Sequence, residues 1–141
     1  GPHTHGSPLV EHLHIETVAN MYPGRLVKRD TTDNDIEVCG AAGNYEGWLG
    51  YSEAAPEFKP ADRTTIYVVD AFAPVHKGGG FRVRASIADG QNITKGERLM
   101  SAAAGELVTW VAATDEAVAI ADESVDNSGG ASHAIWVQSL I

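Results

Sequence analysis

The chain has 141 residues, of which 43% are hydrophobic and 21% charged, so it is long enough to bury a core and too apolar to be disordered throughout. Its 19 acidic and 10 basic residues give a formal net charge of −9, which disfavours binding to the phosphate backbone of a nucleic acid. The single cysteine, Cys39, excludes an intrachain disulfide, and because no apolar run approaches the length of a membrane-spanning helix we expect no membrane partner.

Residues 1–22 precede the first turn-bounded strand pattern, and they carry two His-x-His pairs. The pairs are His3/His5 and His12/His14. Around the second pair, Leu13 and Ile15 alternate with the histidines and share one strand face. A strand with so few apolar residues has no core of its own, so we interpret residues 1–22 as an extended N-terminal arm that contacts another protein. The expected partner-binding residues of this arm are His12, Leu13, His14 and Ile15.

The same histidine pairs allow a metal-binding interpretation, since histidines two residues apart on a strand can share one ion. No third ligand stands at a diagnostic spacing, so we expect no metal site. The chain also has no G-x-S-x-G, H-E-x-x-H or dinucleotide-binding motif. Its adjacent carboxylates, Asp115-Glu116 and Asp122-Glu123, would lie on opposite strand faces. We therefore expect no catalytic residues, no cofactor and no enzyme activity.

The globular part is predicted to begin with the turn around Pro23 and Gly24 and to form a single β domain over residues 23–141. In chain order, strands are predicted at residues 26–27, 36–38, 64–70, 81–87, 93, 99–100, 107–112, 117–121 and 134–141. A surface loop is expected at residues 52–63 and a mobile connection at 74–80. Residues 96–104 are the one helical candidate. Short strands with Gly or Asp turns between them indicate an all-β fold, either a small β-barrel or a β-sandwich, with at most one short helix.

Three aromatic residues leave two functional classes open. Trp48, Tyr51 and Trp110 could form an aromatic platform, which would favour a small-ligand or carbohydrate-binding β-module. If these side chains are instead buried, they fill the end of a barrel and favour a structural role.

The order of turns and strands also resembles a known family. The matching segments are residues 23–27, 47–51 and 75–78, then Asp89, Gly90, Ile93, Gly96 and Leu99, then Ala104-Gly105, and finally Ala117, Ala119, Ala121 and Glu123. Together they resemble the capsid decoration (cement) proteins of tailed bacterial or archaeal viruses over about five-sixths of the chain. The part from Gly90 to Leu99 is also similar to turns of lipoyl and biotinyl carriers, but neither Lys77 nor Lys95 has the flanking residues of a carrier lysine.

The resemblance implies a β-tulip-like domain and a structural virion protein without bond chemistry. Its implied location is the outer surface of the capsid, where it would stabilise the shell. Its implied partners are the major capsid protein, contacted by the N-terminal arm, and two further copies of itself in a homotrimer.

Overall fold

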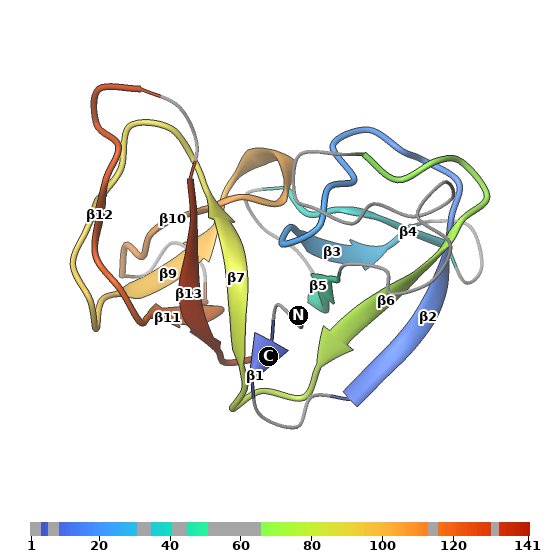
Figure 1. Ribbon diagram of the computed structural model, residues 1–141, viewed down its shortest axis with the longest axis horizontal. Coiled ribbons are helices and arrows are strands. Elements are labelled where there is room, and N and C mark those ends of the chain that lie inside the picture. The colour runs from blue at the N-terminus through green and yellow to red at the C-terminus, as the bar shows by residue number, and fades with distance from the viewer. Residues whose placement is uncertain are drawn as a thin grey trace.

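Short strands with alternating inward residues assemble into two small barrels that lie side by side (Figure 1). The computed structural model describes residues 4–5, 9–30, 35–40, 45–50, 66–112, 116–130 and 133–141. Among these residues the helical content is one 3₁₀ turn, η1 (Ala103–Gly105). The predicted all-β, small-barrel fold class is confirmed.

The first barrel consists of β2 (Leu9–Ile15), β4 (Asp35–Val38), β3 (Leu26–Arg29), β5 (Tyr45–Leu49) and β6 (Phe72–Lys77), in that spatial order. Pairing of β6 with β2 closes it. All neighbours are antiparallel except β2 and β4, which run parallel. The core holds Leu13, Ile15, Met21, Val27, Ile36, Leu49, Tyr67, Ala73 and Val75.

The prediction that residues 1–22 form an arm outside the core is wrong for its longer strand. β2 pairs with β6 over six residue pairs, and Leu13 and Ile15 are buried inside the barrel. Met21 is fully buried as well. The alternating pattern is not a stripe for another protein, because β6 and β4 of the same chain are the partners of β2. The domain boundary expected at residue 22 therefore falls within the first barrel. The short β1 (Thr4–His5) pairs with β7 of the second barrel.

The second barrel consists of β7 (Arg82–Ile87), β10 (Leu107–Thr109), β9 (Arg98–Ser101), β11 (Ala119–Ala121) and β13 (His133–Ser139). Because β13 also pairs with β7, the five strands form a closed ring. Only β10 and β7 are parallel within this ring. A two-stranded ribbon of β8 (Asn92–Ile93) and β12 (Val125–Asp126) extends from it.

Side chains of the first barrel complete the core of the second. Leu26 of β3, Trp48 of β5 and the nearby Cys39 are buried in the same cluster as β7, β9 and β13 residues. The Trp48 indole Nε1 donates a hydrogen bond to the hydroxyl oxygen of Ser139 at 2.9 Å. The backbones also meet closely, since the Ser86 amide donates to the Gly24 carbonyl. The two barrels therefore share one packed junction.

Several of the strand predictions are confirmed. The predicted strand at 81–87, the short strand at Ile93 and the first hairpin of residues 26–38 are confirmed. Residues 66–70 are not a strand, and β6 instead occupies most of the connection expected at 74–80. The helix predicted at 96–104 is wrong because Leu99 lies in β9. The loop expected at 52–63 lies outside the described residues.

Candidate partner-binding face

The four residues predicted to bind a partner are divided between the two sides of β2. Leu13 and Ile15 point into the first barrel and are buried, so they are unavailable to another protein while the barrel is folded. His12 is exposed and His14 is partly exposed, because even-numbered residues of β2 point out of the barrel. In the antiparallel pairing, His14 lies opposite Phe72 at the start of β6. Of the four predicted residues, only His12 and His14 are thus accessible to a partner.

The segment before β6 closes the end of the first barrel and leaves apolar side chains outside. Tyr67 fills the barrel end, where it is fully buried and its hydroxyl donates to the Gly50 carbonyl at 2.5 Å. Burial raises the pKa of the Tyr67 phenol, so the hydroxyl stays protonated and can donate. Val68 and Val69 next to it are exposed, Val69 by 56%, and Phe72 is exposed by 55%. Large apolar side chains gathered at one place on a surface indicate an interaction site.

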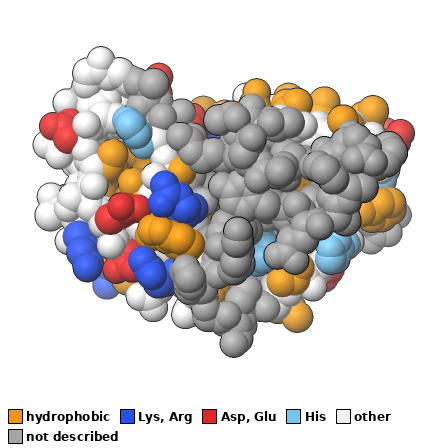
Figure 2. Space-filling model, viewed as in Figure 1, with side chains coloured by type: hydrophobic (Ala, Val, Ile, Leu, Met, Phe, Trp, Pro, Cys, Tyr) orange, Lys and Arg blue, Asp and Glu red, His pale blue; other side chains and the backbone are white. Residues whose placement is uncertain are grey.

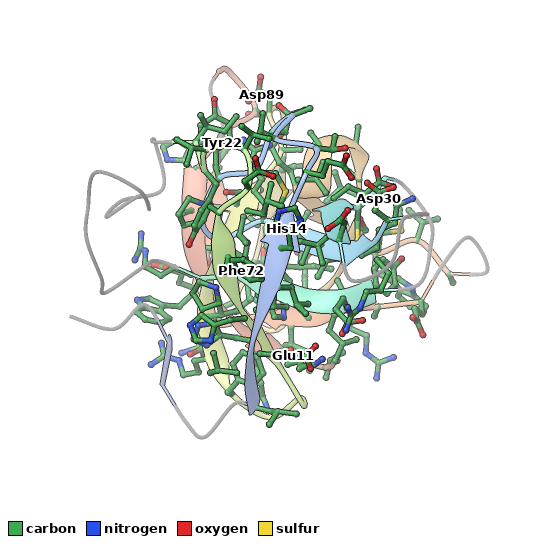
Figure 3. The ribbon with its side chains drawn as sticks, turned by 90° about the vertical axis from the view of Figure 1, so that its right-hand side faces the viewer. Glu11, His14, Tyr22, Asp30, Phe72 and Asp89 are labelled. Carbon is green, nitrogen blue, oxygen red and sulfur yellow. The ribbon has the colours of Figure 1, made fainter. Side chains whose placement is uncertain are left out.

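We call this surface the β2–β6 face. It comprises His12 and His14 on the outer side of β2, Phe72 opposite His14, and the exposed Val68 and Val69 of the segment that leads into β6. Figure 3 looks onto this side of the first barrel and shows His14 and Phe72 close together on neighbouring strands. Their ring centroids are 5.3 Å apart with the planes tilted by 57°.

The imidazole of His14 is held between two carboxylates. When protonated, the ring donates from Nδ1 to Asp35 Oδ1 at 2.5 Å and from Nε2 to Asp70 Oδ1 at 3.1 Å. The hydrogen bond to Asp35 is the main reason that the pKa of His14 lies above its ordinary value. The same bond lowers the pKa of Asp35, whereas the pKa of the neighbouring Glu16 is raised chiefly by a hydrogen bond with Asp35. With both nitrogens in hydrogen bonds, the ring has a fixed orientation.

A closed ring of ion pairs lies farther along the first barrel, around Glu11 of β2. Arg29 contacts Glu11 and Glu46 at 2.8 and 3.1 Å, and Lys77 contacts the same two carboxylates at 3.1 and 2.6 Å. The hydrogen bond from Lys77 is the main cause of the lowered pKa of Glu11. Burial raises the pKa of Glu46, but the hydrogen bonds from Lys77 and Arg29 outweigh it and the pKa is lowered overall. Four strands each contribute one charge, so the ring links β2, β3, β5 and β6.

The histidine pairs suggest a possible metal site, which the described part of the chain does not provide. No group of three His, Cys, Asp or Glu side chains there is arranged to hold a metal ion. His12 and His14 share the outer side of β2, but both His14 nitrogens already bond to carboxylates. His3 and the side chain of His5 lie outside the described residues.

The aromatic residues do not form the platform that a ligand-binding module would use. Trp48 is fully buried at the junction and Tyr51 lies outside the described residues. Trp110 is partly exposed with the Arg98 guanidinium over its ring, 5.7 Å from the centroid. An aromatic that the sequence did not single out, Trp136, has two arginines over its ring on the outer side of the second barrel. These are Arg82 and Arg84, at 4.9 and 5.7 Å from the ring centroid. Figure 2 shows basic, acidic and apolar side chains next to one another on the surface of the second barrel.

Comparison with known proteins gives no match: no protein-family model fits the sequence, and no functionally described protein is significantly similar to it. Among the described residues, no helix is long and apolar enough to cross a membrane. The functional conclusion therefore depends on the geometry of the chain itself.

Proposed function

We propose that this protein is a structural virion protein that binds the outer surface of a viral capsid and cements the shell. Its partners would be the major capsid protein and two further copies of the same chain in a homotrimer. The observation that carries the proposal is the β2–β6 face, on which Val69 and Phe72 are more than half exposed. A structural protein needs such a contact surface and no reaction chemistry.

The buried position of Trp48 supports this function over a ligand-binding module. An aromatic platform needs its rings open to solvent, whereas the Trp48 indole is fully buried and bonded to Ser139. Trp48 instead joins two barrels into one body. A rigid body of two barrels can transmit force between neighbouring shell subunits, which is what cementing requires.

The turn geometry supports the family resemblance noted in the sequence. Gly90, Gly96 and Gly105 of the quoted pattern all have positive φ, at 77°, 97° and 72°. This backbone region favours glycine, so the pattern reflects turns that other residues would strain. Ile93 and Leu99 of the same pattern are buried in the second barrel. This part of the quoted pattern thus supplies turns and core residues of the second barrel.

Binding to shells is the direct test. Purified protein would be added to capsids of the parent virus that lack it, and both sedimentation with the shells and the temperature of shell disassembly would be measured. We expect saturable binding at a fixed number of copies per shell and a higher disassembly temperature. Native mass spectrometry of the free and released protein would test the trimer. Absence of sedimentation with the shells, or binding with an unchanged disassembly temperature, would contradict the proposal.

The sequence predicts that an arm of residues 1–22 contacts the shell, but in the structure the longer strand of this segment belongs to the first barrel. Leu13 and Ile15 are committed to the barrel core, so the accessible part of β2 is its outer side. In the proposal the shell contact is therefore the β2–β6 face, including His12 and His14.

A further inference from the structure

We propose that the β2–β6 face binds a segment of the capsid protein that combines aliphatic side chains with lysine or arginine. This inference rests on the proposed function and names the chemistry of the partner at that face. It follows from the apolar side chains, the backbone that holds them and the charges around them.

The apolar side chains are displayed outward by a backbone that is fixed at several points. The Tyr67 amide donates to the Met21 carbonyl, and the Asp70 amide donates to the Ile15 carbonyl. In return the Ile15 amide donates to the carbonyl of Ala71. Tyr67 is anchored inside the barrel, whereas its neighbour Val68 is exposed. A preorganised apolar surface loses little conformational entropy when a partner covers it.

The position of the face leaves it free of the second barrel. The junction between the barrels uses the outward residues of β3 and β5, including Leu26 and Trp48. The outward residues of β2 lie on another side of the first barrel, as Figure 3 shows for His14. Partner binding at the β2–β6 face therefore leaves the junction intact.

The surroundings of the face are acidic. Its neighbouring carboxylates are Glu16, Asp30, Asp35 and Asp70. The side chain of Asp70 is 76% exposed, whereas that of Asp35 is 7% exposed and bonded to His14. His14 supplies one compensating positive charge when protonated. Asp70 and the exposed Glu16 are thus the carboxylates of this group that are open to a partner.

The described basic residues of the first barrel do not neutralise this group, because each is paired with another carboxylate. The pairs are Arg25 with Glu106, Lys28 with Glu37, and both Arg29 and Lys77 with Glu11 and Glu46. An acidic partner would be repelled by this face, and a purely apolar one would leave its carboxylates poorly solvated. A partner with both aliphatic and cationic side chains satisfies both parts of the surface.

The test compares full-length variants in the shell-binding assay, after thermal melts show that each is folded. The apolar variant is Val69→Ser with Phe72→Ser, and its matched control is Val111→Ser, because Val111 is exposed by 53% on the second barrel. We expect the apolar variant to bind about tenfold more weakly or worse, and the control to bind as the wild type does.

The charge variant is Glu16→Gln with Asp70→Asn, and its control is the exposed Asp89→Asn on the second barrel. Asparagine is chosen because residue 70 has a positive φ of 66°, which asparagine tolerates, and because its amide oxygen can still accept from His14. We expect weaker binding for the charge variant at about 50 mM salt and little difference from the wild type at about 500 mM, where screening suppresses the charge term.

The outcomes separate this inference from the proposed function. If the wild type binds shells and the apolar variant binds equally well, the face is not the contact and the inference is overturned while the function stands. If the charge variant binds like the wild type at low salt, the partner is not cationic and the inference is again overturned. If the wild type itself does not bind shells, the proposed function fails and the inference fails with it.

Discussion

Replacing Trp48 with alanine should destabilise both barrels together. The indole is fully buried where the first barrel packs into the core of the second, and its Nε1 donates to Ser139 at 2.9 Å. Truncating a buried Trp costs about 3–5 kcal/mol through lost burial and the cavity left behind. Loss of the hydrogen bond adds about 1 kcal/mol. For a chain of this size we expect the melting temperature to fall by about 10–20 °C.

Calorimetry together with circular dichroism would measure this change, and two variants separate its causes. Trp48→Phe retains much of the apolar volume but lacks the N–H donor, so it should lose only about 1–3 kcal/mol. Trp110→Ala removes the same type of side chain from a partly exposed position under Arg98, and should cost about 1 kcal/mol or less.

Because one junction serves both cores, the two barrels should unfold in a single transition. A Trp48→Ala protein that melts within a few degrees of the wild type would show that the junction contributes little. A calorimetric trace with two transitions, one unchanged from the wild type, would show that the barrels unfold independently. Either result would refute the inferred coupling.

Three further predictions concern the stability of the barrels. The pKa values of Glu11 and Glu46 are lowered in the folded state. The stability from their ion pairs is therefore fully present above the ordinary pKa of 4.5 and is lost as the pH falls through the lower folded values. In urea melts across this acidic range, the free energy of unfolding of the double variant Glu11→Gln, Glu46→Gln should depend less on pH than that of the wild type. Gly24→Ala should lower the free energy of unfolding by about 1–3 kcal/mol, because Gly24 has φ +87° and an added Cβ would lie 2.7 Å from the Arg84 carbonyl oxygen; a chemical denaturation midpoint equal to the wild type would contradict this. Deleting residues 1–16 removes β2 and should strongly lower or abolish the single cooperative melt of the chain, and an unchanged melt would restore the interpretation of this segment as a free arm.

Local patterns in the sequence were sufficient for much of the second barrel. The alternation from Phe81 to Ile87 places Val83, Ala85 and Ile87 inside, and the structure buries all three. Turn glycines such as Gly90 and Gly96 mark the ends of strands because their backbone conformation is local. Such signals depend on residues near one another in the chain, so the sequence alone predicts them.

The same kind of pattern was misleading at β2. Leu13 and Ile15 indicated one apolar strand face, but the sequence did not say whether that face meets another protein or the core of its own barrel. The answer lies in the pairing with β6, more than 50 residues away, as in the match of Leu13 with Ala73. Which strand pairs with which depends on residues far apart in the sequence, so local periodicity does not predict it.

The candidate face depended even more on tertiary structure. A strand was expected at residues 64–70 because this segment is rich in β-branched and aromatic side chains. The part that the structure describes, residues 66–70, is not a strand. In the folded protein Tyr67 is drawn into the barrel end, while Val69 stays outside together with Phe72. His14 was identified from the sequence, but its two carboxylate partners, Asp35 and Asp70, come from distant segments. The sequence alone therefore determined the fold class and many turns, whereas barrel closure decided which apolar side chains form the core and which remain for a partner.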